Sequence, residues 1–203
     1  MIIFRVGQTQ LHTMRSILNG SRKYYIALAL AGALIFSPLM LHTKAQAEGF
    51  MGPDKVYSIR SVLSRKALDI DLRWFRGRED GLRLIQWDYH GGSNQLFKIT
   101  SAGDGCYFIM ALNSNSFLDV DISGASTPDG PVLQQWQFTG YANQMFRIIP
   151  DSGYYRIVAR HNERSLDVRN NSRDSGAQIF AAVHDTKACR TRDSQLFSFV
   201  QIQ

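Results

Sequence analysis

A phrase that recurs three times constrains this chain more than any other feature of its sequence. Each copy begins with Leu and Asp before an apolar residue, continues to an aromatic residue, and ends with a polar residue, Gln, an apolar residue and Phe. The closing residues Phe97, Phe146 and Phe197 lie 49 and 51 positions apart. This period predicts one supersecondary unit used three times. The predicted repeats span about 54–101, 102–150 and 151–203.

The first 47 residues resemble a secretory signal peptide. Arg22 and Lys23 precede an apolar run over residues 24–41, and residues 45–47 (Ala-Gln-Ala) supply the small side chains that a signal peptidase requires. We therefore expect a signal peptide over 1–47 and a folded domain over 48–203.

Two alternatives apply to the N-terminal segment. Met14 is a second candidate start, which would give the signal peptide a more usual length. An uncleaved segment would instead anchor the protein in a membrane, because the apolar run is close to the roughly 20 residues that span a bilayer. Pro38 and the Ala-x-Ala site favour cleavage. We expect a secreted or periplasmic protein, with membrane contact only if the segment is retained.

The positive charge of the chain comes mostly from the same segment. The whole sequence has 23 Lys and Arg against 17 Asp and Glu, a net charge of +6, but residues 1–47 hold five basic and no acidic residues. Residues 48–203 therefore keep 18 basic and 17 acidic residues. A nearly neutral domain gives no reason to expect a nucleic-acid partner.

The two cysteines, Cys106 and Cys189, are candidates for one disulfide in an exported protein. They lie in different repeats at non-equivalent positions. Two separate thiols remain the alternative, because sequence spacing does not fix the distance between them.

Short strands and turns fill the repeats. Each repeat opens with a β-branched or aromatic run, at residues 56–62, 107–112 and 154–159. Loops rich in Gly, Asp, Asn and Ser follow at 77–81, 124–130 and 170–176. Closing three such units on a threefold axis would remove exposed strand edges and bring the three closing Phe residues into a shared core.

The second repeat shows the motifs most completely, with Leu-Asp-Val at 118–120, Gln-Gln-Trp at 134–136 and Asn-Gln-Met-Phe at 143–146. From about Val56 to Val200, these motifs in this order resemble the ricin-B-type β-trefoil lectins, which include carbohydrate-binding modules of bacterial glycosidases. The resemblance implies an all-β fold, a β-trefoil with three pseudo-equivalent repeats. It also implies a non-catalytic lectin that binds glycans and needs no cofactor.

In that family each repeat can hold one shallow sugar site. The Asp accepts hydrogen bonds from two hydroxyls, the aromatic residue stacks on the apolar face of the sugar ring, and the Asn binds a further hydroxyl. The resemblance assigns two sites to this sequence: Asp69, Trp87, His90 and Asn94 in repeat one, and Asp119, Gln134, Trp136 and Asn143 in repeat two. Repeat one has Ile85 where the family usually has Gln, and repeat two has Thr139 where repeat one has His90.

The third repeat departs from this pattern. Asp167, Gln178 and Phe180 match the motif, but Ser194 replaces the Asn. The interval from Phe180 to Ser194 is 14 residues, against seven in the other repeats. We expect this weaker third site to be degenerate or blocked.

Each assignment has a structural alternative. An Asp in a turn often caps its own backbone, Trp87 and Trp136 could pack within the cap, and the Asn residues could order tight turns. The Asp pairs 69/71 and 119/121 indicate a solvated face and no metal site, because no further ligands cluster near them.

Two other functions compete with glycan binding. A protein-binding subunit that delivers or assembles a secreted toxin or enzyme complex is the main alternative, favoured by Ile85 and the altered third repeat. An enzyme is not expected, because no Ser-His-Asp or metal-ligand grouping appears and the repeats occupy nearly all of residues 48–203.

Overall fold

The computed structural model describes residues 50–74, 77–123, 130–183 and 192–202. Residues 1–47 and Cys189 lie outside them, so the signal peptide and the disulfide remain predictions. Among the described residues, no helix is long and apolar enough to cross a membrane.

Each repeat contributes four strands to the described structure. Repeat one holds β1 (Lys55–Ser61), β2 (Ala67–Ile70), β3 (Leu84–Trp87) and β4 (Phe97–Gly103). Repeat two holds β5 (Cys106–Ala111), β6 (Phe117–Val120), β7 (Leu133–Trp136) and β8 (Phe146–Asp151). Repeat three holds β9 (Tyr154–Ala159), β10 (Ser165–Val168), β11 (Ile179–Ala182) and β12 (Phe197–Ile202). Four 3₁₀ turns are η1 (Ser93–Gln95), η2 (Ala142–Gln144), η3 (Arg169–Asn171) and η4 (Asp193–Gln195).

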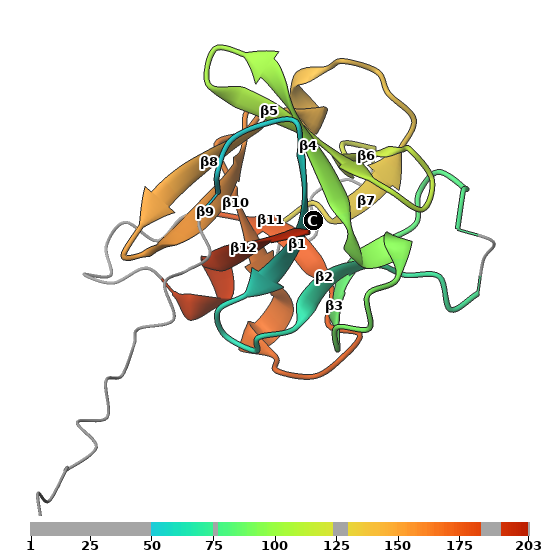
Figure 1. The fold of residues 1–203 in the computed structure, drawn as a ribbon, viewed down its shortest axis with the longest axis vertical. Helices are drawn as coiled ribbons and strands as arrows, with labels where there is room; N and C mark the ends of the chain where they lie inside the picture. The colour runs from blue at the N-terminus through green and yellow to red at the C-terminus, as the bar shows by residue number, and fades with distance from the viewer. Residues whose placement is uncertain (1–49, 75–76, 124–129, 184–191, 203) are drawn as a thin grey trace, which may run out of the picture. The chain divides into compact units, whose positions relative to one another are not determined.

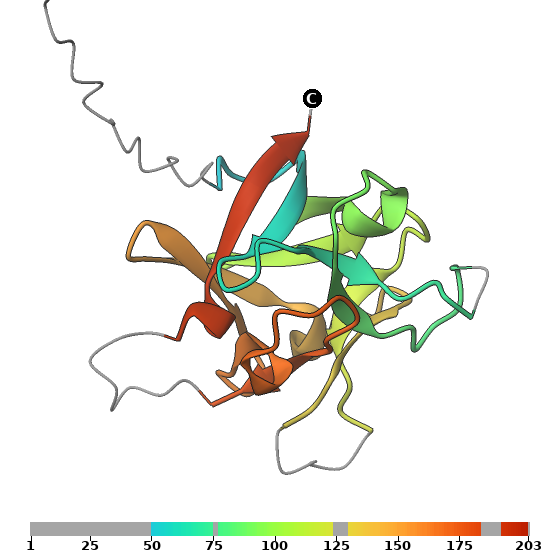
Figure 2. The same ribbon diagram turned by 90° about the horizontal axis from the view of Figure 1, so that it is seen from below.

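The first and last strands of the repeats close into a six-stranded barrel. Antiparallel pairing runs from β1 to β4, β5, β8, β9 and β12, and β12 pairs again with β1. Figure 1 shows these strands around a common centre, and Figure 2 shows β12 (red) alongside β1 (cyan) from below. Closure leaves no free edge in the barrel, so the predicted β-trefoil is confirmed.

The middle strands form one hairpin per repeat: β2–β3, β6–β7 and β10–β11. Three isolated bridges join the hairpins in a cycle: Arg83 to Gln134, Val132 to Phe180, and Gln178 to Ile85. Each bridge joins the residue two positions before the partner of the site Asp in one repeat to the partner of the site Asp in another repeat. The cycle therefore fixes which residues correspond between repeats independently of the motifs.

The core lies inside the barrel and under the hairpins. Phe97, Phe146 and Phe197 have no exposed surface and belong to one continuous apolar cluster, so their predicted core role is confirmed. Each opens a barrel strand whose alternate residues point inward, as a half-buried strand requires.

One glycine per repeat lets a loop approach the next hairpin. Gly81, Gly130 and Gly176 all adopt positive φ, at 83°, 109° and 91°. A Cβ on Gly130 would lie 2.3 Å from the backbone oxygen of Ala181. Only glycine fits both the backbone conformation and the space there.

Candidate functional site

In the second repeat, the predicted site residues meet in one place. Asp119 on β6 lies directly opposite Gln134 on β7, and Trp136, two residues further, faces the same side. Asn143 in η2 donates from Nδ2 to Asp119 Oδ2 at 2.8 Å, and Gln134 donates from Nε2 to Oδ1 at 3.3 Å. All four side chains, together with Thr139, line one surface hollow. We call this group site two.

The first repeat gathers its predicted residues in the same way. Asn94 in η1 donates from Nδ2 to Asp69 Oδ1 at 2.9 Å, and His90 Nε2 lies 3.5 Å from Asp69 Oδ2. Trp87 lies two residues beyond Ile85, which pairs with Asp69. Ile85 is buried and offers no hydrogen bond at the position where Gln134 bonds Asp119. We call this group site one.

Both tryptophans are partly exposed, as stacking platforms must be, but their surroundings differ. In site one the Arg73 guanidinium lies over the Trp87 ring, 5.4 Å from its centroid, and is held there by two hydrogen bonds to Asp71. The equivalent residue in repeat two is Ser123, whose amide and hydroxyl both donate to Asp121. Among the described residues, no arginine lies over the Trp136 ring.

The carboxylates at the base of the sites are buried. Asp69 and Asp119 are each 4% exposed and Asp167 is 5% exposed, so the interpretation of Asp69 and Asp119 as part of a solvated face was wrong. Burial raises the pKa of all three carboxyls, and the side-chain amides around them act in the opposite direction. Neighbouring amide donors therefore fix each carboxylate as an oriented acceptor of hydrogen bonds.

The sequence did not reveal the role of the Gln in the Asn-Gln-x-Phe ending. Gln95 donates from Nε2 to Asp69 Oδ2 at 2.8 Å, and its Oε1 accepts the His90 amide at 2.8 Å. Gln195 likewise donates to Asp167 Oδ2 at 2.7 Å, and Gln144 accepts the Thr139 amide at 2.9 Å. This Gln orients both the Asp and the turn beside it. The Gln occurs in all three copies of the motif, and this repetition was the sequence signal that could have revealed its role.

The third repeat requires a correction. Phe180 pairs with Asp167, so it occupies the position of Gln134, and Ala182 occupies that of Trp136. The bridge from Val132 to Phe180 gives the same correspondence. The alignment of Gln178 and Phe180 with Gln134 and Trp136 was therefore wrong by two residues.

The corrected alignment leaves the third repeat without an aromatic residue at the platform position. Arg169 stands where the other repeats have Asp71 and Asp121, and its Nη1 donates to Gln178 Oε1 at 3.1 Å. Ser194 is buried at the position of the Asn. Only the Asp and its Gln partner are kept from the site pattern.

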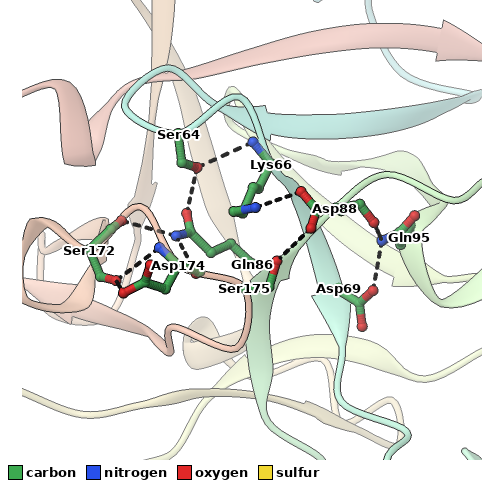
Figure 3. A network of polar contacts seen from close by, with 9 residues as sticks. All are labelled: Ser64, Lys66, Asp69, Gln86, Asp88, Gln95, Ser172, Asp174 and Ser175. Carbon is green, nitrogen blue, oxygen red and sulfur yellow. Dashed lines mark hydrogen bonds and ion pairs between the residues drawn. The ribbon is translucent and has the colours of Figure 1, made fainter.

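A second glutamine ties repeat one to repeat three. Gln86 is fully buried, and its Nε2 donates to the backbone oxygens of Ser172 at 3.0 Å and Asp174 at 2.9 Å. Its Oε1 accepts the Ser64 hydroxyl at 2.7 Å. Figure 3 shows this amide between the two repeats, one strand away from the Asp69–Gln95 pair. We call these three bonds the Gln86 clasp.

The next repeat has an equivalent clasp. Gln135 donates from Nε2 to the backbone oxygen of Glu79 at 2.7 Å and accepts the Ser114 hydroxyl at 2.9 Å. The third repeat has Ala181 at this position, since Ala181 pairs with Leu166 as Gln135 does with Leu118. Two of the three repeat boundaries therefore carry this glutamine.

The described residues contain neither a candidate metal cluster nor a disulfide. Within the described ranges, no three His, Cys, Asp or Glu side chains group closely enough to hold a metal ion. Cys106 is buried at the start of β5 and forms no disulfide with a described residue. What the two sites offer is an aromatic face, a fixed carboxylate and an amide, which together can bind a polyhydroxylated ring.

Comparison with known proteins identifies one family. The profile of the "Ricin-type beta-trefoil lectin domain-like" family matches residues 49–122 and 103–181. No curated protein matches the chain.

Solved structures share the fold. A designed 3-fold symmetric protein, ThreeFoil, is 34% identical over 72% of this chain and 99% of its own, with a TM-score of 0.64. The exo-beta-1,3-galactanase 1,3Gal43A from Clostridium thermocellum is 28% identical over 73% of this chain but only 30% of its own, with a TM-score of 0.63. The Macrolepiota procera ricin B-like lectin, solved with lactose, is 16% identical over 74% of this chain and 98% of its own, with a TM-score of 0.58.

Proposed function

Because the chain belongs to the ricin-type β-trefoil lectin domain-like family, we propose that it binds glycans through sites one and two without cleaving them. The observation that carries this proposal is site two, where an aromatic ring, a buried carboxylate and two side-chain amides converge on one hollow. A sugar ring has an apolar face and a rim of hydroxyls, which match these groups directly.

The geometry supports weak individual sites. The hollow of site two has a volume of about 230 Å³. Typical small-molecule pockets hold about 300–1,000 Å³ and cover most of the ligand. A sugar in site two would therefore stay largely in water, with a dissociation constant near the millimolar end of the range. Two sites on one rigid body would gain avidity on a multivalent glycan surface.

Two further parts of the proposal concern the third repeat and export. We propose that the third repeat does not bind sugar, because Ala182 and Ser194 stand at the aromatic and Asn positions. We also propose export, from the signal-peptide pattern of residues 1–47. The galactanase is an enzyme, but this chain aligns with only 30% of it, so its catalytic activity is not carried over.

Matched aspartate variants test the function. The double variant Asp69→Asn with Asp119→Asn should be retained on immobilised galactose or lactose at least about tenfold less than the unaltered protein, because charged acceptors become neutral. Asp167→Asn is the matched control, since Asp167 is about equally buried but its repeat has Ala182 at the platform position. Galactose and lactose are chosen because the neighbouring galactanase and the lactose complex concern galactose-containing glycans.

The outcomes separate the alternatives. Retention of the double variant at the level of Asp167→Asn would show that the site assignment is wrong. If the unaltered protein binds no glycan on a broad array, glycan binding itself is refuted. That result would favour the alternative of a protein-binding subunit of a secreted toxin or enzyme complex.

A further inference from the structure

Two well-exposed apolar side chains border site two. Of the seven large apolar side chains that are well exposed in the described part of the chain, Ile122, Phe138 and Tyr141 belong to the second repeat. Tyr141 is 71% exposed and Ile122 is 68% exposed, and both line the hollow that holds Asp119 and Trp136. Exposed apolar surface that adjoins a binding site indicates additional contact area for the ligand.

Repeat one lacks this aromatic residue for a steric reason. Gly92 precedes η1 as Tyr141 precedes η2, so the two residues are equivalent. A Cβ on Gly92 would lie 2.5 Å from the His90 ring and 2.6 Å from Asn94 Oδ1. His90 in its present position thus leaves no space for a larger side chain at residue 92.

Repeat two avoids this crowding because it has a smaller side chain at the position of His90. Thr139 replaces His90, and its Oγ1 accepts the Tyr141 amide at 3.4 Å. The smaller side chain leaves room for Tyr141, whose ring stands in solvent at the margin of the hollow. Repeat one therefore has a histidine near its carboxylate, whereas repeat two has an aromatic residue at the rim of its hollow.

We propose that Tyr141, supported by Ile122, is a second stacking platform, so that site two binds an oligosaccharide through two adjacent sugar rings while site one binds a single ring. The inference rests on the proposed glycan function and names the ligand class of site two. The first ring lies on Trp136 and bonds Asp119 and Asn143, and the second lies on Tyr141. An aromatic residue needs only its ring for this role, because the contact is with the apolar face of a sugar.

Nuclear magnetic resonance of the tryptophan indole N–H groups tests the inference, since Trp87 and Trp136 report on separate sites. Galactose, lactose and β-1,3-galactobiose are titrated separately into the purified protein. At Trp136 at least one disaccharide should bind roughly two- to tenfold more tightly than galactose, the gain expected from one added aromatic contact. At Trp87 the disaccharides and galactose should bind equally.

Two variants complete the experiment. Tyr141→Ala should remove the disaccharide gain at Trp136 and leave galactose binding unchanged, whereas Tyr141→Phe should keep the gain. The inference is overturned if Tyr141→Ala preserves the ratio, or if the unaltered protein shows no gain at Trp136 while galactose still shifts that signal. If no sugar shifts either signal, the proposed glycan function fails and the inference fails with it.

Discussion

Gln86 gives the most direct measure of how strongly the repeats hold one another. The variant Gln86→Met keeps the length of this fully buried side chain and removes the three bonds of the Gln86 clasp. Each hydrogen bond contributes about 0.5–1.5 kcal/mol net. The expected loss in the free energy of unfolding is therefore about 1.5–4.5 kcal/mol.

That loss is large enough to read from thermal unfolding. In a domain of this size 1 kcal/mol lowers the midpoint by about 2–4 °C, so Gln86→Met should lower it by roughly 3–18 °C. Circular dichroism in the far ultraviolet follows the transition. The control is Gln201→Met, which makes the same chemical change at an exposed position of β12 and should leave the midpoint unchanged.

A midpoint for Gln86→Met within about 1 °C of the unaltered protein would refute this reasoning. It would mean that the backbone bonds beside the clasp, such as the one from the Gln86 amide to the Ala177 oxygen, hold the repeats together without help from the side chain. The third boundary, which has Ala181 in place of the glutamine, would then be the general case.

Three further predictions concern pH and backbone space. Burial raises the pKa of Asp119 above its ordinary 3.8, so lactose binding at site two should already weaken above pH 3.8 as the solution is acidified, measured by titrations at several pH values. Burial also raises the pKa of Asp167 in the folded protein. The contribution of Asp167 to the free energy of unfolding is therefore fully present below pH 3.8 and is lost as the pH rises through the raised pKa. Asp167→Asn should remove this pH dependence of the free energy of unfolding. Gly103→Ala, at φ +82° in open space, should cost about 1–2 kcal/mol in urea unfolding, and Gly130→Ala should cost more because its Cβ would meet the Ala181 oxygen. Equal costs for the two glycine variants would contradict the close approach seen at Gly130.

The barrel and the first two sites could be predicted because the repeat supplies the same information three times. Phe97, Phe146 and Phe197 recur at one spacing, and a position shared by three units must satisfy the same packing around the axis. The family resemblance assigned Asn94 to one site with Asp69 and Asn143 to another with Asp119, and in the structure each Asn donates a hydrogen bond to its Asp.

The register of the third hairpin could not be predicted in the same way. A shift of two residues keeps every side chain on its own face of a strand, so alternation of polar and apolar residues does not detect it. The sequence Gln178-Ile179-Phe180 therefore imitated the Gln-x-aromatic motif, although the structure places Ala182 at the platform.

The glutamine clasps escaped prediction for a different reason. Gln86 and Gln135 recur at the repeat interval, 49 positions apart, but each bonds backbone oxygens in the loop of a neighbouring repeat. The recurrence does not identify these partners, because the contact depends on how the repeats pack. Their buried side chains are explained only once the repeats are placed side by side.

A crystal structure of the protein with lactose is the sharpest test of whether sites one and two bind sugar. We expect one sugar ring on Trp136, with its hydroxyls bonded to Asp119 and Asn143, a second lactose molecule at Trp87, and none at Ala182. Lactose bound away from both tryptophans, or bound on the third repeat alone, would contradict this expectation.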